Sequence, residues 1–369
     1  MGEKYGDILD YNKLDPVKRE ALELFSSTFA HPERLGIRLV SSGETGAVFD
    51  FVNYDFMIGF NVEGLGTKNM IADQMYEDFK MRGYPNPERV YLFIGQDTAA
   101  MSVMDLVSVG ADPFAYGDFF TAGADGWFED PNRNTTLLHG YKTAADIAGF
   151  AIPCGETPVL PGIVDPKTLV LEGASVGLIR PKSRFPAGGA KIMEGDIIYG
   201  LPSNGVAANG ISKTRKIAAR LPEGYSTKLP SGVSLGDALL VPTPMYVRPV
   251  IEMFNEGLHY ASPITGHGWE KAGRSRFPFR YVIDKLPKQP EVFKFLVEVG
   301  PRCGQDVSDR ENHYVWNMGT SIVLIGPAAS ERKYRDIASS HGAELQVLGH
   351  VEKGDREVYL AEKNISYTP

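Results

Sequence analysis

The stretch at residues 62–70, Val-Glu-Gly-Leu-Gly-Thr-Lys-Asn-Met, collects side chains that suit a nucleotide site. Glycines let a backbone turn sharply and bring its N–H groups close to an anion. Lys68 offers a positive charge to phosphate, and Glu63 offers an oxygen ligand to a metal ion. The same residues also fit an ordinary turn with a solvated lysine, so this stretch alone leaves both interpretations open.

Acidic residues in apolar surroundings form a second group of candidates. Asp97, Met101 and Asp105 recur at four-residue spacing and would share one face of a helix that is otherwise mostly small or apolar. Buried carboxylates are costly unless they are paired or bind a metal ion. The alternative is that Asp97 caps the helix and that Asp105 is a polar residue with satisfied hydrogen bonds. Asp118 lies in a predicted aromatic strand, and a predicted turn presents Glu156.

Two glycine-bearing loops lie in the second half of the chain. Residues 203–210, Ser-Asn-Gly-Val-Ala-Ala-Asn-Gly, lead into a predicted helix, and such a loop at a helix start is a natural anion cradle. A plain connection between a strand and a helix is the alternative. Residues 265–268, Thr-Gly-His-Gly, form another flexible polar loop. His267 could titrate or bind a metal ion, although a lone histidine there is more often a surface or hydrogen-bonding residue.

Alternating helices and strands must position these residues. In the first half, hydrophobic spacing and turn residues predict helices at 21–29, from Asp97 to Val109 and at 135–150. They also predict a hairpin over 48–62 and strands at 91–95, 114–120 and 168–179. A mobile loop is expected at 41–46 and a turn at 152–157. In the second half they predict strands at 196–201 and 319–325, helices at 211–220, 246–254, 291–299 and 331–340, and two strands within 345–360.

The stretch 181–189 is rich in proline, glycine and basic residues and is the best candidate for a linker. A chain of 369 residues is long for one core and comfortable for two. We therefore expect an N-terminal domain of residues 1–181 and a C-terminal α/β domain of residues 182–369.

Composition excludes several classes of function. A net charge of -8 leaves no general basic surface for nucleic acid or anionic lipid, so a phosphate-bearing ligand must meet a local cluster of donors. No apolar run approaches the length that spans a membrane. Only Cys154 and Cys303 are present and no signal-like segment opens the chain, so we expect a cytoplasmic protein without disulfides.

The order of these motifs resembles the aminoimidazole ribonucleotide synthetase family, also called phosphoribosylformylglycinamidine cyclo-ligase. Residues 63–68, Glu-Gly-Leu-Gly-Thr-Lys, resemble its Asp-Gly-Val-Gly-Thr-Lys, and residues 118–123, Asp-Phe-Phe-Thr-Ala-Gly, resemble its Asp-Tyr-Phe-Ala-Thr-Gly. Residues 154–162, Cys-Gly-Glu-Thr-Pro-Val-Leu-Pro-Gly, resemble its Gly-Gly-Glu-Thr-Ala-Glu-Met-Pro-Gly. The similar pieces elsewhere are Val103-Met104-Asp105, Asn209-Gly210, residues 240–247, Thr265-Gly266 and Asn317-Met318-Gly319.

That resemblance implies a mixed α/β (α+β) fold in which the N-terminal sheets of two subunits pair into a barrel-like homodimer core, each followed by a C-terminal α/β domain. It also implies the ATP-dependent cyclisation of formylglycinamidine ribonucleotide to aminoimidazole ribonucleotide in purine biosynthesis. ATP would phosphorylate the amide oxygen, and an intramolecular nitrogen would then displace phosphate. ATP would lie near the dimer interface together with Mg²⁺.

The resemblance further implies a role for each motif residue. Glu63, Asp105 and Glu156 would hold Mg²⁺, and Lys68 would touch the ATP phosphates and act with Asp105 in catalysis. The other cofactor-binding residues would be Gly64, Gly66, Thr67, Asp97 and Asp118. The substrate-binding residues would be Asn204, Gly205, Asn209, Gly210, Thr265, Gly266 and Asn317.

The chain departs from the family pattern at Glu63 (Asp in the family), Met104 (Asn), Cys154 (Gly), Ala207 (His) and Pro263 (His). The nucleotide half therefore keeps the pattern better than the substrate half does. One alternative is a divergent paralogue that phosphorylates another small molecule, as thiamine-monophosphate kinase does. The other is a non-catalytic binding subunit that keeps the dimer.

Overall fold

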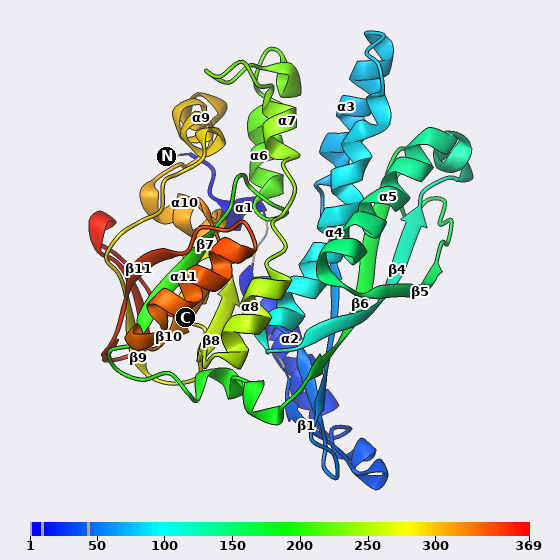
Figure 1. Ribbon diagram of the computed structural model, residues 1–369. Coiled ribbons are helices and arrows are strands. Elements are labelled where there is room, and N and C mark those ends of the chain that lie inside the picture. The colour runs from blue at the N-terminus through cyan, green and yellow to red at the C-terminus, as the bar shows by residue number, and fades with distance from the viewer. Residues whose placement is uncertain (1, 9–10, 43–44) are drawn as a thin grey trace.

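Two β-sheets, one in each half of the chain, organise the computed structural model (Figure 1). The structure describes residues 2–8, 11–42 and 45–369, so part of the loop expected at 41–46 lies outside the described residues. None of the helices in these ranges is both long and apolar enough to cross a membrane.

The first sheet has the strand order β1-β2-β3-β6-β4-β5. Its neighbours are antiparallel except β4 and β5, which run parallel. A helix connects these two strands, as a parallel pair requires. The strands are β1 (Ile37–Ser41), β2 (Ala47–Phe51), β3 (Met57–Gly64), β4 (Asp112–Ala122), β5 (Ala151–Glu156) and β6 (Leu169–Ile179).

Helices cover one face of this sheet. α4 (Val90–Ser108) packs on β3, β4 and β6, and both α3 (Asn69–Met81) and α5 (Pro131–Ala148) pack on α4. α4 is buried along nearly its whole length because its residues are small or apolar on every side. Glycines allow α4 and α5 to approach closely, since a Cβ atom on Gly140 would lie 2.1 Å from the carbonyl oxygen of Leu92.

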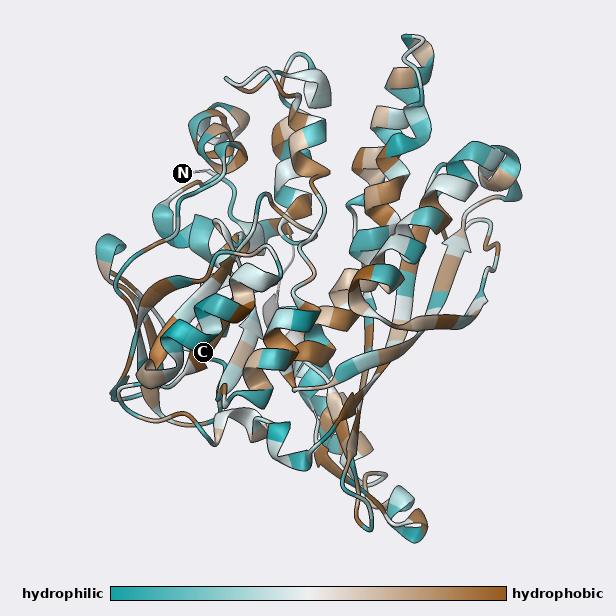
Figure 2. Cartoon of the chain, in the orientation of Figure 1, coloured by the Kyte–Doolittle hydropathy of each residue, from teal (hydrophilic) through white to brown (hydrophobic). Residues whose placement is uncertain are grey.

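The opposite face of the first sheet stays exposed. Alternate residues of its strands point away from α4 and α5, and among them Phe60 is 40% exposed and Val62 is 60% exposed. Phe119 on β4 and Val170 on β6 are also large, apolar and exposed. Figure 2 shows hydrophobic segments along these strands. Large apolar side chains exposed on one face of a sheet make that face a candidate interaction surface.

The second sheet has the strand order β13-β12-β9-β11-β7-β10-β8, antiparallel except for the β9–β12 pair. Its strands are β7 (Ile197–Pro202), β8 (Tyr260–Pro263), β9 (Phe279–Ile283), β10 (Thr320–Gly326), β11 (Gln346–Lys353), β12 (Glu357–Leu360) and β13 (Ile365–Tyr367). The helices of this half are α6 (Ile211–Ala218), α7 (Leu235–Leu239), α8 (Val247–Asn255), α9 (Glu291–Val299), α10 (Asp309–Val315) and α11 (Glu331–Ser340).

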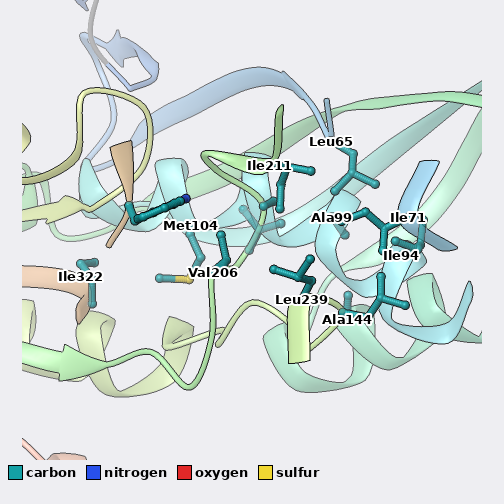
Figure 3. Packing of buried hydrophobic residues seen from close by; sticks show 14 of the residues in the cluster. Leu65, Ile71, Ile94, Ala99, Met104, Ala144, Val206, Ile211, Leu239 and Ile322 are labelled. Atoms are coloured by element: carbon teal, nitrogen blue, oxygen red, sulfur yellow. The ribbon is translucent and has the colours of Figure 1, made fainter. Parts of the chain in front are cut away.

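One hydrophobic core joins the two halves. Figure 3 shows Leu65 and Ile94 from the first half in the same cluster as Leu239 from the second. α4 is central to this contact because it packs against β8 and α8 as well as against its own sheet. A site that lies between α4 and the second half is therefore held by packing on both sides.

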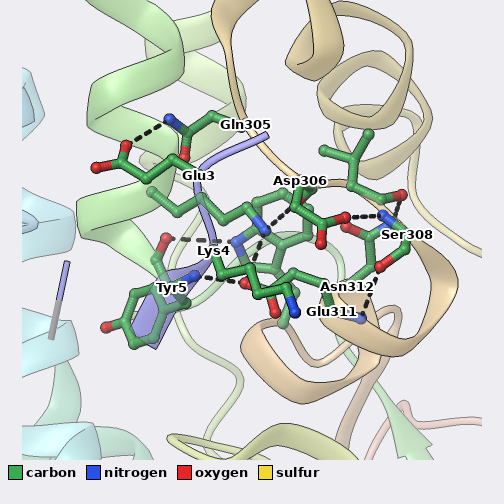
Figure 4. A network of polar contacts seen from close by, with 12 residues as sticks. Glu3, Lys4, Tyr5, Gln305, Asp306, Ser308, Glu311 and Asn312 are labelled. Atoms are coloured by element: carbon green, nitrogen blue, oxygen red, sulfur yellow. Dashed lines mark hydrogen bonds and ion pairs between the residues drawn. The ribbon is translucent and has the colours of Figure 1, made fainter. Parts of the chain in front are cut away.

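The N-terminal segment also packs against the second half. It contains α1 (Tyr5–Ile8) and α2 (Tyr11–Ser26). The backbone N–H of Asp306 donates to the carbonyl oxygen of Glu3 at 2.9 Å, and the N–H of Tyr5 donates to a carboxylate oxygen of Glu311 at 2.5 Å (Figure 4). These first residues therefore contact the C-terminal unit, although the expected domain of residues 1–181 includes them.

Most of the predicted elements are confirmed. The hairpin is β2–β3, and α9 and α11 have the predicted bounds. The strand predicted at 91–95 is wrong because these residues form the first turns of α4, and Asp97 lies inside this helix instead of capping it. A short apolar run looks the same in a buried strand and in a buried helix. The turn predicted at 152–157 is largely strand β5. The expected domain boundary after residue 181 lies in the connection between β6 and β7.

We predict that Gly140→Ala destabilises the protein. The new methyl group would collide with the backbone of α4, so the free energy of unfolding should fall by about 1–3 kcal/mol, even though alanine favours a helix over glycine. Denaturant unfolding measures this change. Gly126→Ala is the matched control because its nearest neighbour would be 3.9 Å away, and equal stability of the two variants would contradict the close helix contact.

Candidate active site

A buried ion pair lies where the glycine-rich stretch meets α4. Lys68 follows the turn that Gly66 makes with a positive φ of 74° and directly precedes α3. Its side chain is 0% exposed, and its ammonium group lies 2.5 Å from the Asp97 carboxylate. The ammonium also donates to the carbonyl oxygen of Val241 at 2.9 Å, and Asp97 accepts from the N–H of Thr243 at 2.5 Å. Lys68 and Asp97 thus join the two halves of the chain.

A pair of carboxyl groups lies two helical turns further along α4. Asp105, only 8% exposed, is hydrogen-bonded to the carboxyl group of Glu63 at the end of β3. Burial raises the pKa of Asp105 well above its ordinary value, and the negative charge of Glu63 raises this pKa further. The negative charges of two carboxylates this close repel each other, and a cation between them relieves this repulsion. They are therefore a natural place for a bound cation.

Two basic residues that we did not predict face this carboxyl pair. They are Lys271 and Arg274, and Lys271 lies in the 3₁₀ helix η7 (Gly268–Gly273). Burial and the charge of Arg274 lower the pKa of Lys271, while the charges of Asp105 and Glu63 oppose this shift. The ammonium of Lys271 donates to the hydroxyl group of Thr265. The sequence signal for these residues was their position just after the loop at 265–268.

A small cavity lies between α4 and the second half, directly beside Asp105. Its volume is about 20 Å³, and the predicted residues Asn209, Thr265 and Asn317 line it together with Asp105. The structure therefore brings one member of each predicted loop to α4. The side chain of Asn317 is committed to positioning because its amide donates to the carbonyl oxygen of Gly205 at 2.9 Å and its oxygen accepts from the N–H of Gly319 at 2.9 Å.

The loop at 203–210 packs against α4. The amide nitrogen of Asn209 lies 4.0 Å from the sulfur of Met101. Gly210 has a positive φ of 70°, and a Cβ atom there would lie 2.4 Å from the indole ring of Trp316, so glycine is needed. Asn204 is exposed at the start of the loop. Gly205 and Gly210 therefore shape the backbone of the loop at 203–210, and Gly266 belongs to the loop at 265–268.

Asp118 lies on the same face of the sheet as Glu63 but two strands away, since both residues pair with Gly173 of β6. Burial raises the pKa of Asp118. Its surroundings are the residues of a separate hollow beneath α5, among them Phe120 and Tyr141.

Glu156 is far from the carboxyl pair within one chain. Glu156 is exposed on the edge strand β5. In the register of the sheet, the residues in line with it are Phe119 on β4, Glu172 on β6 and Gly64 on β3. Three strand spacings separate it from Gly64, or about 14 Å. The described residues accordingly contain no group of three His, Cys, Asp or Glu side chains that could hold a metal ion. The structure thus brings together Glu63 and Asp105 but not Glu156.

A much larger hollow, of about 1060 Å³, lies between α3 and the start of α5. Arg133 stacks 4.0 Å from the ring of Trp127 in its wall. No predicted site residue lines this hollow. The carboxyl pair and its basic neighbours therefore remain the candidate site.

We predict that breaking the buried ion pair strongly destabilises the fold. Lys68→Met leaves the Asp97 carboxylate buried without its cation, so the free energy of unfolding should fall by about 3–5 kcal/mol. The double variant Lys68→Met/Asp97→Leu removes both charges and should recover much of this loss. Thermal and denaturant unfolding of the single and double variants measure the difference. Equal losses in both would show that the charges do not interact.

Family models match both halves of the chain. The model of the AIR synthase related protein N-terminal domain matches residues 43–179, and that of the C-terminal domain matches residues 193–361. The phosphoribosylformylglycinamidine cyclo-ligase of Methanobrevibacter smithii is 30% identical over 307 residues, which are 82% of each chain. That of Thermoplasma acidophilum is 31% identical over 307 residues, which are 81% of each chain.

Solved structures share the fold at lower identity. Thiamine-monophosphate kinase from Stenotrophomonas maltophilia K279a superposes with a TM-score of 0.57 at 19% identity and covers 91% of this chain and 94% of its own. Hydrogenase maturation protein HypE in complex with ATP superposes with a TM-score of 0.54 at 18% identity over 74% of this chain and 78% of its own. Together with the family models and the 30% identity over most of its length, these similarities lead to one conclusion: the chain belongs to the AIR synthase related protein family.

Proposed function

We propose that the protein catalyses the ATP-dependent cyclisation of formylglycinamidine ribonucleotide to aminoimidazole ribonucleotide, a step of purine biosynthesis. The observation that carries this proposal is the Glu63–Asp105 carboxyl pair, which faces Lys271 beside a cavity lined by both predicted substrate loops. The relatives that are named cyclo-ligases support it. The HypE structure, which contains ATP, supports the use of this nucleotide.

The reaction needs positioning and charge more than a covalent enzyme intermediate. The amide oxygen of the substrate forms a bond to the γ-phosphorus of ATP, and ADP leaves with the electrons of the broken P–O bond. A nitrogen of the same substrate then attacks the activated carbon, and inorganic phosphate leaves. Holding both ends of the substrate in place supplies much of the rate.

The carboxyl pair fits a magnesium ion. Mg²⁺ is commonly held by one or two carboxylates together with substrate phosphates and water, and this pair offers two. Glu63 and Asp105 would hold it, and the ion would supply neutralisation of the phosphate charge. A cation there would also relieve the repulsion by Glu63, which contributes to the raised pKa of Asp105.

The substrate side must open before the substrate binds. A cavity of about 20 Å³ has room for one water molecule and no nucleotide. Asn209 and Thr265 lie in loops of the second half, so a movement of these loops away from Asp105 would widen the space while the Lys68–Asp97 pair stays in place. Gly64 directly follows Glu63, and Gly64 and Thr67 would line the nucleotide side of the opening.

We also propose that the protein is a homodimer that pairs through the exposed face of its first sheet. The apolar residues Phe60, Val62, Phe119 and Val170 support this surface. Glu156 pairs with Phe119, so it lies at the margin of the same face. We propose that Glu156 acts across the dimer at the nucleotide site of the partner subunit, because it is too far from the carboxyl pair of its own chain to join it.

A cytoplasmic location is consistent with the cysteines. Cys154 is exposed and Cys303 is buried, and both are free thiols. Free thiols persist in reducing compartments. These thiols support our proposal that the reaction takes place in the cytoplasm.

We predict that the purified protein with MgATP releases ADP in response to formylglycinamidine ribonucleotide and forms aminoimidazole ribonucleotide. Asp105→Asn should lower kcat at least about 100-fold because it weakens cation binding at the transferring phosphate. Asp146→Asn is the matched control, since its side chain is 64% exposed on α5. A coupled ADP assay and detection of the product measure both. ADP release with thiamine monophosphate alone would favour the kinase alternative, and none with either substrate would reject the proposal.

We predict that Val62→Lys dissociates the dimer. A lysine at the centre of the apolar face cannot be buried in the interface without losing its hydration, so the variant should be monomeric at micromolar concentration. Light scattering coupled to gel filtration measures the mass. Met81→Lys, at a residue 79% exposed at the end of α3, is the control and should remain dimeric. A monomeric unmodified protein would contradict the interface.

A further inference from the structure

The lysine that the glycine-rich stretch supplies is not available to a ligand. The ammonium group of Lys68 is buried and already has two partners, the carboxylate of Asp97 at 2.5 Å and the carbonyl oxygen of Val241 at 2.9 Å. To reach a phosphate, Lys68 would have to break its ion pair and leave the Asp97 carboxylate unpaired inside the core. Leaving such a carboxylate unpaired is costly.

The second half supplies another ammonium group near the carboxyl pair. Lys271 is only partly buried, and its charge acts on both Asp105 and Glu63. Its ammonium donates to Thr265, which lines the cavity beside Asp105. Lys271 therefore contacts one of the proposed substrate loops and also interacts with the carboxyl pair, which suits a residue that contacts a phosphoryl group passing from one to the other.

The backbone around Lys271 is rigidly anchored. Its carbonyl oxygen accepts from the hydroxyl group of Ser262 at 2.8 Å. Two residues earlier, the fully buried Trp269 donates from its indole nitrogen to the carbonyl oxygen of Asn317 at 3.1 Å. Gly268 packs so closely on α10 that a Cβ atom would lie 2.1 Å from the carbonyl oxygen of His313. Only the side chain of Lys271 has to move to follow a ligand.

The charges of Glu63, Asp105, Lys271 and Arg274 explain when the side chain of Lys271 would move. The carboxyl groups of Glu63 and Asp105 face the cations Lys271 and Arg274, and the positive charge of Lys18 also acts on Lys271. A divalent cation bound by the carboxylates would take over their charge and leave Lys271 and Arg274 without counter-ions. Two unpaired cations beside a divalent ion attract a polyphosphate.

We infer that Lys271, and not Lys68, is the ammonium group that contacts the transferring γ-phosphoryl group, while Lys68 has a structural role in joining the two halves. This inference rests on the proposed use of ATP. Lys271 is then a catalytic residue that stabilises the charge on the phosphoryl oxygens while the bond to ADP breaks and the bond to the substrate oxygen forms.

The test compares Lys271→Met, Lys271→Arg and Lys68→Met with Lys353→Met, whose parent side chain is 82% exposed on β11. Lys271→Met should keep the unfolding temperature within a few degrees of that of the unmodified protein. It should lower kcat about 100-fold, and Lys271→Arg should restore part of this loss because it keeps the charge. Lys353→Met should behave as the unmodified protein does.

A second measurement separates this inference from the proposed reaction. Calorimetric titration with the magnesium complex of AMPPNP needs no turnover, and Lys271→Met should weaken its binding about tenfold or more. This result would support the inference even if formylglycinamidine ribonucleotide proved not to be the substrate. Unchanged binding and unchanged kcat in Lys271→Met would overturn it. A larger loss of affinity in a folded Lys68→Met protein than in Lys271→Met would also overturn it.

Discussion

The buried ion pair between Lys68 and Asp97 is the interaction on which the rest of the site depends. An unpaired charge in this core would be strongly destabilising, so the pair can persist only while all of its partners stay in place. Two of those partners, the carbonyl oxygen of Val241 and the N–H of Thr243, belong to the second half of the chain. The pair thus fixes where the second half meets α4. Asp105 follows two helical turns later, about 12 Å along the same helix, and this geometry sets its distance from η7.

This arrangement separates two tasks that one lysine could be expected to perform. A residue that holds two domains together must not move, whereas a residue that follows a phosphoryl group must respond to a ligand. Burial suits the first task, and a partly buried position beside a carboxyl pair suits the second. Lys68 and Lys271 meet these different conditions. The glycine-rich stretch therefore contributes Glu63 directly to the site, while Lys68 stabilises the contact between the two halves that surround the site.

The sequence predicted the elements that repeat a clear period and missed what depends on distant contacts. α9 and α11 follow from amphipathic spacing, and the hairpin that delivers Glu63 follows from two apolar runs around a polar turn. The apolar run at 91–95 predicts a strand because a fully buried helix has no polar face to reveal its period. The sequence also allows Asp97 to cap the helix, because its real partner, Lys68, is remote in the sequence.

The candidate site shows the same limit. The acidic motifs located Glu63 and Asp105, and the loops located Asn209 and Thr265, because each lies in a short local pattern. No local sequence pattern marks Lys271 as a site residue, because the carboxyl groups near it come from distant parts of the sequence and meet it only in the fold. Glu156 was assigned to the same metal site by motif order, which cannot tell whether two motifs meet within one chain or across two.

The substrate side raises a chemical question, because Ala207 and Pro263 stand where the family pattern has histidines. Both line the small cavity beside Asp105, so a methyl group and a pyrrolidine ring replace two imidazoles at the reacting end. The proposed chemistry tolerates this change. Phosphorylation turns the amide oxygen into a good leaving group, and the attacking nitrogen belongs to the same molecule, where correct orientation alone can supply effective molarities of about 10⁵–10⁸ M. Orientation by Asn209 and Thr265, and charge from Lys271, are then the contributions that matter most, and none of them requires an imidazole.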